Sequence, residues 1–451
     1  MMFTVDELAR ITGGTWCCGT PSTGPSCTGH DTRRPIADGM YVAITGGQHD
    51  GHDFMAQAEA TGATMALVER EVPDSMPQLI VPDTIVALGQ LASAWRERLP
   101  DTCVISITGT AGKTTTKDLM HHVLHGSRRG QASPASWNNA IGGPMSLLQA
   151  RPGDDYIVLE VGTSSPGEIT SLGQIMRPDV AVITLVGHGH LEGLGSLEGV
   201  RREKYSLLDH VQQNGLAIVH DDGHRLLPEA RTLRHGDRET SSPRLIRRID
   251  GLIELEDGSR FQFDWPGQHH AVNALAVIAV ARHLGLDDET IDSALATSVP
   301  SRSRGEERIV GSIRFIDDAY NANPNSVAAS LASFSELSAA GRRVVMLGDM
   351  LELGIESDRH HASLASEIDV SGKPGSLDVL LLFGEGMASL YRELGETESV
   401  HHWASLDEDS MHEVADLLAA DDLVLLKGSR GMKLERIIEH IQRRESEAPT
   451  A

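Results

Sequence analysis

The sequence predicts an α/β protein of three domains. At 451 residues the chain exceeds the length of one ordinary domain. Short runs with the character of buried strands alternate with helical stretches, which is typical of parallel sheets joined by crossover helices. This alternation restarts after Arg304. We therefore expect domains over residues 1–100, 101–304 and 305–451, with the closing stretch "RRESEAPTA" disordered.

The first domain is predicted to be small and of mixed α/β type. It should begin with a helix, because Thr4 and Glu7 have the spacing of a capping box. Acidic residues so early in the chain do not fit a secretory signal peptide. The segments "GMYVAI" and "GATMALVE" are expected strands, each following a turn or a helix.

The central domain is predicted around a parallel sheet. The run "CVISIT", from Cys103, should be a buried strand that leads into a glycine-containing loop and then into a helix through His125. Further strands are expected at "DYIVLEVG", "DVAVITLVG" and "GLAIVHDD". The Ala-rich stretch "HHAVNALAVIAVARHLGL" predicts an amphipathic helix that ends at Gly285.

The third domain is predicted to be Rossmann-like. Four strand runs alternate with helices there: "IRFIDDAY", "RRVVMLGDM", "DVLLLF" and "DLVLLKG".

The composition argues against several classes of partner. The net charge of −25 makes nucleic acid and anionic membranes poor partners. No apolar run reaches the length of about 18 residues that a membrane crossing needs, and we expect a cytoplasmic protein without membrane insertion. Cys17, Cys18 and Cys27 lie close together, but their spacing matches no zinc template, and all four cysteines are expected to be reduced thiols. The acid-rich, lysine-poor composition fits either a saline habitat or codon bias toward arginine.

The stretch "ISITGTAGKTTTKDLM", residues 105–120, predicts a phosphate-binding loop. Such a loop aims backbone N–H groups at phosphate from a helix N-terminus, and adds a lysine for the terminal phosphates and a hydroxyl for Mg²⁺. Lys113 and Thr114 supply these two groups. The general motif has a glycine where this chain has Ile107, so the loop is a shortened version with Gly109 and Gly112. The alternative is a glycine-rich turn without a ligand.

Oxygen and nitrogen ligands for a metal follow two of the predicted central strands. Glu160 ends one strand, and His188 and His190 follow the next, at the edge where α/β sheets bind ligands. The alternative for each histidine is an ordinary solvated loop residue. His190 is the stronger candidate because the glycines around it let the backbone come close to a ligand.

Several blocks of the sequence resemble the Mur ligase family. The loop "TGTAGKTTT" is similar to that of Mur ligases and of the related folylpolyglutamate synthases, which form amide bonds with ATP. Six further blocks resemble the member that joins D-alanyl-D-alanine to UDP-N-acetylmuramoyl-tripeptide: "WNNAIGGPMSLL", "LEVGTSSPGEI", "HLEGLGSLEGV", "DDAYNANPNS", "MLGDMLELG" and "LLKGSRGMKLE". The stretch that begins "DTRRPIADGMYVAI" is similar to the uridine-nucleotide-binding domain of that member. The resemblance runs in order from about residue 30 to 440.

The resemblance implies an ATP-dependent ligase of peptidoglycan precursor synthesis. Its partners would be UDP-N-acetylmuramoyl-tripeptide and D-alanyl-D-alanine, and its cofactors ATP and two Mg²⁺ ions. We expect a monomer, and the sequence leaves the oligomeric state open. The family match places the ATP phosphates on Gly109, Thr110, Ala111, Gly112, Lys113, Thr114 and Thr115.

The same match implies the metal ligands. Thr114 and Glu160 would hold one Mg²⁺, and His190 a second together with Lys204 in carbamylated form. Carbamylation turns an ammonium into an oxygen donor, which a hard metal prefers. The chain has only six lysines, so a lysine at this position favours a specific role. The alternative is a surface lysine paired with Glu203 or Glu198.

The remaining site residues also come from the match. Lys113, Lys204, His190 and Arg304 would be catalytic, and Asn273, Arg304 and Asp318 would contact the nucleotide. His270 stands where the family usually has a further asparagine, and an imidazole cannot both donate and accept as an amide does. The residues implied for substrate binding are Thr32, Arg33, Lys427, Ser429 and Arg430.

Four other residues fall in or near these blocks. Asn321 and Asn323 have turn chemistry before Pro324 as an alternative to ligand contact. Glu352 matches a family block without an assigned role, and His361 is expected to be an ordinary surface residue.

Three alternatives stay open at this point. A related ligase would add a different amino acid or peptide to another carboxylate. A P-loop phosphotransferase or plain ATPase would be expected to have the full glycine spacing and no use for Lys204. A nucleotide-binding subunit without activity would not need Lys113, Glu160, His190 and Lys204 together.

Overall fold

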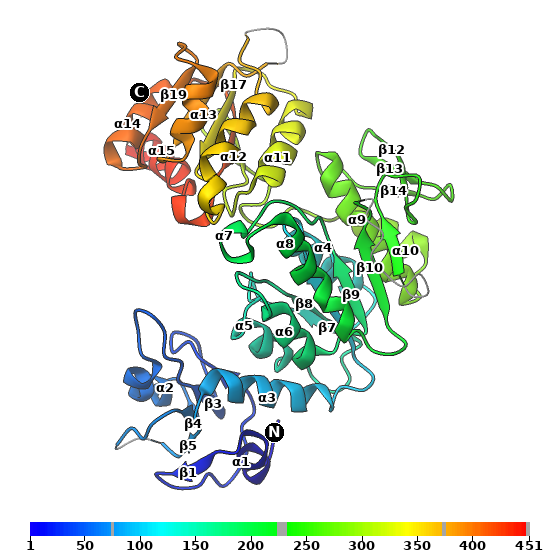
Figure 1. Cartoon of the computed structure of the whole chain (residues 1–451), viewed down its shortest axis with the longest axis vertical. Coiled ribbons are helices and arrows are strands. Elements are labelled where there is room, and N and C mark those ends of the chain that lie inside the picture. Colours follow the sequence, from blue (N-terminus) through cyan, green and yellow to red (C-terminus); the bar gives the residue numbers. More distant parts are fainter. Residues whose placement is uncertain (74–75, 223–231, 372–375, 448–451) are drawn as a thin grey trace.

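The computed structural model describes residues 1–73, 76–222, 232–371 and 376–447, and its elements form three domains arranged along the long axis of the molecule (Figure 1). The expected three-domain α/β architecture is confirmed. The predicted boundaries at residues 100/101 and 304/305 fall in connections between elements, and as boundaries they stay predictions. Within the described residues, none of the helices combines the length and apolar character that a membrane crossing requires.

The N-terminal domain is built on a five-stranded sheet in the order β1-β5-β4-β3-β2, in which only β1 is antiparallel to its neighbour. The strands are β1 (Thr15–Cys17), β2 (Thr28–Gly29), β3 (Gly39–Val42), β4 (Ala63–Val68) and β5 (Gln78–Ile80). The helices are α1 (Val5–Thr12), η1 (Gly51–Phe54), α2 (Met55–Ala60) and α3 (Thr84–Arg96). The predicted capping box is confirmed: Oγ1 of Thr4 accepts from the backbone N–H of Glu7, and the Glu7 carboxylate accepts from the backbone N–H of Thr4.

The central domain contains an all-parallel six-stranded sheet in the order β11-β10-β9-β6-β8-β7. Its strands are β6 (Cys103–Thr108), β7 (Gly130–Ala132), β8 (Tyr156–Glu160), β9 (Val180–Ile183), β10 (Leu216–His220) and β11 (Thr232–His235). Its helices are α4 (Lys113–His125), α5 (Gly142–Leu147), α6 (Glu168–Met176), α7 (Leu191–Leu194), α8 (Leu197–Tyr205), η2 (Ser206–His210), α9 (Gln268–His283) and α10 (Asp288–Ala296). A separate antiparallel sheet follows, with β12 (Leu245–Ile249), β13 (Leu252–Leu255) and β14 (Arg260–Gln262).

Helix α9 differs from its predicted amphipathic character. All residues from Ala271 to Ala281 are buried, because α9 contacts α4, β10 and β11 of the parallel sheet region and also β12 of the antiparallel sheet. Its Ala-rich composition allows this close packing on several sides, whereas an amphipathic helix would keep one face in water. The helix ends at His283, just before Gly285, which has φ +82°.

The C-terminal domain has a six-stranded sheet in the order β15-β16-β20-β17-β18-β19, parallel except for the pairing of β15 with β16. Its strands are β15 (Glu306–Val310), β16 (Ile313–Asp317), β17 (Arg343–Gly348), β18 (Val379–Phe383), β19 (Val400–Trp403) and β20 (Leu423–Lys427). Its helices are α11 (Pro324–Glu336), η4 (Gly354–Glu356), α12 (Ser357–Ser363), η5 (Leu364–Glu367), α13 (Met387–Leu394), α14 (Glu408–Leu417), η6 (Arg430–Met432) and α15 (Glu435–Glu447).

Two predictions for this domain are wrong. The stretch 443–447, expected in the disordered tail, continues α15, and residues 448–451 lie outside the described residues. His361 is not on the surface: its side chain is 1% exposed, and its Nε2 accepts a hydrogen bond of 2.9 Å from the backbone N–H of Met350.

The N-terminal and central domains share one apolar core. A single cluster of buried side chains joins residues of the first sheet, such as Met65, to residues of the central domain, such as Leu172. Helix α3 lies at this junction and contacts both α5 and α6 (Figure 1). Burial of a continuous apolar surface favours a fixed relation between these two domains.

Candidate active site

A cavity of about 1020 Å³ lies where the central and C-terminal domains meet, and it extends to α3. Most of the site residues predicted from the sequence line this cavity. The nominated residues that line it are Thr110, Ala111, Gly112, Lys113, Thr114, Thr115, Glu160, His190, Asn273, Arg304, Asp318, Lys427, Ser429 and Arg430. Gly109, Lys204, Thr32 and Arg33 are not in the lining.

The glycine loop has the predicted strand–loop–helix context, between β6 and α4. Gly112 has φ +84°, and a Cβ there would come within 2.8 Å of Oδ1 of Asn273. Gly109 has φ +150°, and a Cβ there would meet Oγ1 of Thr184 at 2.0 Å. The positive φ angles and close neighbours favour glycine at these two positions, whereas Ile107 lies within β6, before the turn of the loop.

Lys113 turns back over its own loop. Its Nζ donates to the carbonyl oxygens of Gly109 at 2.8 Å and of Thr110 at 3.4 Å. Burial lowers the pKa of the Lys113 amine, and the nearby carboxylates of Glu160 and Glu352 oppose that shift. The ammonium therefore lies at the mouth of the loop, with acidic groups from both domains near it.

Glu160, at the end of β8, is 1% exposed and uses both of its carboxylate oxygens. Oε2 accepts from Oγ1 of Thr114 at 2.6 Å, and Oε1 accepts from Nδ2 of Asn138 at 2.8 Å. From across the cavity, Nη2 of Arg304 donates to Oγ1 of Thr114 at 2.9 Å. The Arg304 guanidinium also lies 4.0 Å from the ring centroid of Tyr320, a distance at which cation and ring attract.

His190 is the N-cap residue of α7 and has a left-handed backbone with φ +55°. Its Nδ1 lies 2.5 Å from Oε2 of Glu352, in the loop after β17 of the C-terminal domain. This bond lowers the pKa of the Glu352 carboxyl. His188 forms a second link between the domains, because its backbone N–H donates to Oδ1 of Asn325 at 2.9 Å.

Lys204, on α8, is completely buried, and its Nζ has no hydrogen-bond partner among the described residues. The alternative of a surface lysine paired with Glu203 or Glu198 is therefore wrong. Glu203 instead accepts from the backbone N–H groups of Gly167 and Ile169, each at 2.8 Å. Burial, followed by the charge of Lys113, drives the pKa of the Lys204 amine well below its usual range.

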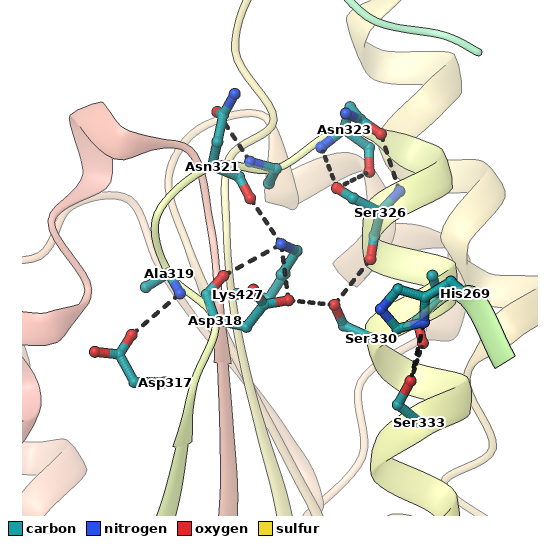
Figure 2. Close-up of polar contacts among 12 residues, drawn as sticks. His269, Asp317, Asp318, Ala319, Asn321, Asn323, Ser326, Ser330, Ser333 and Lys427 are labelled. Carbon is teal, nitrogen blue, oxygen red and sulfur yellow. Dashed lines mark hydrogen bonds and ion pairs between the residues drawn. The ribbon is translucent and has the colours of Figure 1, made fainter. Parts of the chain in front are cut away.

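The C-terminal wall of the cavity is organised around Asp318 and Lys427 (Figure 2). Their side chains form an ion pair of 2.9 Å, and Nζ of Lys427 also donates to the carbonyl oxygen of Asn321 at 2.8 Å. Ser330 on α11 donates to the Asp318 carboxylate. Asn323 caps α11 by accepting from the backbone N–H of Ser326 at 2.9 Å, so the expected turn chemistry is present there.

Two neighbouring histidines line the cavity near α11. Nδ1 of His269 is 3.3 Å from Oγ of Ser333 on α11 (Figure 2). The rings of His269 and His270 are 3.9 Å apart. Burial lowers the pKa of His269 to about 4 and that of His270 well below its usual range. Both rings are therefore neutral near pH 7, and the position of the expected asparagine is occupied by an imidazole tilted against the ring of His269.

Thr32 and Arg33 lie apart from the cavity lining. The Arg33 side chain is 88% exposed and pairs with Asp31 at 2.8 Å. Their neighbours reach the central domain instead. His30 and Arg34 contact the ring of Trp137, at 5.3 Å and 5.6 Å from its centroid.

The sequence pattern missed the residues that link elements far apart in the chain. Asn138, Tyr320, His30 and Arg34 had no assigned role, although Asn138 and Tyr320 lie in the quoted blocks "WNNAIGG" and "DDAYNANP". Among the described residues no group of three or more His, Cys, Asp or Glu side chains forms a ready metal cage. All four cysteines are free thiols, as expected.

This geometry defines a class of protein. A P-loop on a parallel sheet faces cations and carboxylates of a second α/β domain across a shared cavity, which is the arrangement of multidomain enzymes that act on nucleotide phosphates. The sequence model of the "Mur ligase middle domain" matches residues 107–281, and that of the "Mur ligase, glutamate ligase domain" matches residues 304–430. The chain belongs to the Mur ligase family.

Relatives cover nearly the whole chain. A Bacillus subtilis protein named UDP-N-acetylmuramoyl-tripeptide–D-alanyl-D-alanine ligase is 32% identical over 91% of this chain and 92% of its own length. The Escherichia coli protein of the same name is 31% identical with the same coverage.

Solved structures of MurF proteins also match nearly the whole chain. MurF from Acinetobacter baumannii matches with a TM-score of 0.86 at 28% identity, over 98% of this chain and 99% of that one. MurF ligase from Thermotoga maritima in complex with ADP matches with a TM-score of 0.79 at 27% identity, over 94% of this chain and 98% of that one.

Proposed function

We propose that this chain is an ATP-dependent ligase that joins D-alanyl-D-alanine to UDP-N-acetylmuramoyl-tripeptide through an acyl phosphate. The observation that carries the proposal is the meeting of Lys113, the Thr114–Glu160 pair and Arg304 in one cavity, whose opposite wall carries Lys427 of the C-terminal domain. The names of the similar proteins from Bacillus subtilis and Escherichia coli supply the substrates. The cytoplasmic location expected from the sequence stays a prediction, and a supply of ATP fits it.

The nucleotide would lie along the glycine loop. The backbone N–H groups of residues 109–115 and the N-terminus of α4 suit the β- and γ-phosphates, with Lys113 beside them. Asn273 lies against Gly112, where it can contact the nucleoside. Asp318, on the far wall, offers carboxylate oxygens to a ribose.

The donor set fits Mg²⁺. Thr114 and Glu160 provide a hydroxyl and a carboxylate that already touch, and His190 provides an imidazole in the same lining. When bound, Mg²⁺ ions neutralise phosphate charge and polarise the transferred phosphoryl group. Hard cations prefer oxygen, and the buried Lys204 amine would become an oxygen donor as a carbamate.

The structure supplies a reason for Lys204 to be modified. Carbon dioxide reacts with the neutral form of an amine: a C–N bond forms, and a proton is released to give a carbamate. Burial and the charge of Lys113 favour this neutral form. The free amine is also a buried polar group without a hydrogen-bond partner among the described residues, and burying such a group costs folding free energy. A carbamylated Lys204 would bring two oxygens into the surroundings of Lys113 and Glu160, whose charges act on its amine.

The chemistry needs two steps because oxide is a poor leaving group from a carboxylate. In the first step the terminal carboxylate of the tripeptide attacks the γ-phosphorus of ATP; the new O–P bond replaces the bond to ADP. Lys113 and Arg304 offset the repulsion between the two anions and the charge that develops between them. In the second step the amine of D-alanyl-D-alanine attacks the acyl carbon. Its C–N bond replaces the C–O bond to phosphate, and the nitrogen loses a proton.

The substrate would span all three domains. Thr32 and Arg33 would lie near the uridine diphosphate, where a guanidinium fork suits phosphate, and the His30 and Arg34 contacts with Trp137 mark the path toward the cavity. Lys427, Ser429 and Arg430 would face the peptide end. Lys427 and Ser429 are buried at the end of β20, while Arg430 is exposed and pairs with Glu435.

The test is amine-dependent release of ADP. Purified protein with ATP, Mg²⁺ and UDP-N-acetylmuramoyl-tripeptide should release ADP when D-alanyl-D-alanine is added, and not with a panel of free amino acids. Release with a free amino acid instead would favour the related ligase that uses another amine. Release without any amine would favour a plain ATPase.

A further inference from the structure

Glu352 and His190 meet across the boundary between the C-terminal and central domains. Oε2 of Glu352 is 2.5 Å from Nδ1 of His190, and the backbone N–H of Glu192 donates to the carbonyl oxygen of Glu352 at 3.1 Å. The loop after β17 therefore engages the His190 segment with both a side chain and the main chain. Glu352 belongs to the block "GDMLELG", whose role the proposed function leaves open.

The backbones on both sides are shaped for this contact. His190 has φ +55° and Glu352 has φ +62°, left-handed conformations that non-glycine residues rarely adopt. Such conformations persist where the surrounding structure holds them, and they cluster at functional sites. Gly354 has φ +63°, and a Cβ there would lie 3.3 Å from Cα of Glu192, so the loop approaches the start of α7 closely.

The Glu352 loop is also tied to the peptide side of the cavity. The backbone N–H of Leu351 donates to Oγ of Ser429 at 2.9 Å, and the backbone N–H of Ser429 donates to the carbonyl oxygen of Asp349 at 3.1 Å. Ser429 itself is buried. The main chain next to Glu352 is therefore anchored within the C-terminal domain.

The 2.5 Å approach of the Glu352 carboxylate favours one form of the His190 ring. A negative oxygen this close to Nδ1 favours the proton on that nitrogen, so Nε2 keeps its lone pair. Carboxylates that hold a histidine in this way fix its tautomer and its ring orientation toward a metal. Both His190 and Glu352 line the cavity that holds Thr114 and Glu160.

We infer that Glu352 is a positioning residue that presents Nε2 of His190 to a metal ion, and that it does so only while the C-terminal domain lies against the central domain. The inference rests on the proposed function, because it needs a metal in this cavity. Domain docking would then complete the metal site, so that ATP is activated when the domain carrying the peptide-side residues is in place.

The test measures metal binding directly, with Mn²⁺ as the probe and free Mn²⁺ followed by electron paramagnetic resonance in the presence of ADP. Four variants are compared with wild type: Glu352→Ala, Glu352→Gln, His190→Ala and Glu356→Ala. Glu356 is the matched control, because it is an exposed acid in the same region that faces His360 at 3.7 Å rather than His190.

Glu352→Ala should weaken Mn²⁺ binding by about 10- to 100-fold, the usual cost of losing an outer-shell partner. Glu352→Gln should stay within about threefold of wild type, because its amide oxygen still accepts from Nδ1. Glu356→Ala should bind as wild type does. All variants should bind ADP equally well in the absence of metal. A variant that had lost its fold would also lose this binding, so the measurement is the control for folding.

Two results would overturn this inference but not the proposed function. In the first, His190→Ala loses Mn²⁺ binding while Glu352→Ala binds Mn²⁺ as wild type does. In the second, Glu352→Ala and Glu352→Gln lose metal-free ADP binding to the same extent as Mn²⁺ binding. Absence of Mn²⁺ binding by wild type with ADP would overturn both this inference and the metal site of the proposed function.

Discussion

Thr114 donates from Oγ1 to Oε2 of Glu160 across 2.6 Å, and this bond joins the first turn of α4 to the end of β8. The second carboxylate oxygen of Glu160 accepts from Asn138. A buried carboxylate is retained only where hydrogen bonds or cations compensate for its lost hydration. The pair therefore forms a ready oxygen site beside the phosphate loop.

Replacing Glu160 with Gln tests this site. The amide keeps the size of the side chain and one acceptor but removes the negative charge, so the fold should be retained. We expect kcat to fall by at least about 100-fold, as when a preorganised electrostatic group is lost, and the Mg²⁺ concentration needed for half-maximal rate to rise. ADP release over a Mg²⁺ titration measures both, with thermal melting as the check on folding. A variant with the Mg²⁺ dependence of wild type would rule out Glu160 as a ligand.

The carbamate at Lys204 is tested by chemical rescue. Lys204→Ala should lose at least about 100-fold in kcat, and acetate or propionate should restore part of the activity by supplying the missing carboxylate in the space left by the side chain. Lys204→Arg should be inactive and not rescued, because it keeps a cation. Full activity of the Ala variant without added acid would mean that the carbamate has no role.

Arg304 is tested against a surface arginine. Arg304→Ala should lower kcat by about 100-fold or more, because the cation that reaches Thr114 from across the cavity is lost. Arg314 serves as the control: it pairs with Glu307 on the exposed β15–β16 hairpin, and Arg314→Ala should leave the rate unchanged. Steady-state kinetics on both variants measures kcat. An equal fall in kcat for Arg304→Ala and Arg314→Ala would contradict a catalytic role for Arg304.

The burial of His235 predicts that the stability of the fold depends on pH. Its ring is fully buried, its Nδ1 lies 3.1 Å from the carbonyl oxygen of Val272 beside Asn273, and burial lowers its pKa to about 3. The unfolded chain binds a proton below its ordinary pKa of 6.5, whereas the folded chain does not. Stability should therefore fall as the pH drops from 6.5 toward 3, by up to about 1.4 kcal/mol per pH unit from this group, and should not change above 6.5 for this reason.

The variant His235→Gln should show a shallower loss of stability in this pH range. Chemical denaturation at pH 7.5, 6.0 and 5.0 would measure the slope. Parallel curves for wild type and variant would show that His235 does not titrate as expected.

The confirmed sequence predictions rest on local sequence patterns. The Thr4–Glu7 cap, the start of α4 after the glycine loop and the strand that ends at Glu160 depend on neighbouring residues. Lys204 stood out because lysines are rare in this chain, although its burial could not be read from the sequence. The clustering of Lys113, Glu160, His190 and Arg304 followed from the family resemblance and the rule that strand ends meet at one edge of a parallel sheet.

The rest depends on tertiary contacts that no local pattern reports. The Glu352–His190 ion pair joins segments far apart in the chain. The Arg304–Tyr320 cation–π contact and the burial of His361 also depend on how the chain folds back on itself. Helix α9 was expected to be amphipathic because the pattern cannot show that a second sheet covers its other side.

Transfer of oxygen from the substrate carboxylate to phosphate tests the central claim most directly. UDP-N-acetylmuramoyl-tripeptide labelled with ¹⁸O in its terminal carboxylate is incubated with ATP, D-alanyl-D-alanine and the enzyme, and the released phosphate is analysed by mass spectrometry. An acyl phosphate predicts labelled oxygen in the phosphate and a pentapeptide product of matching mass. Unlabelled phosphate released alongside ADP would contradict the account.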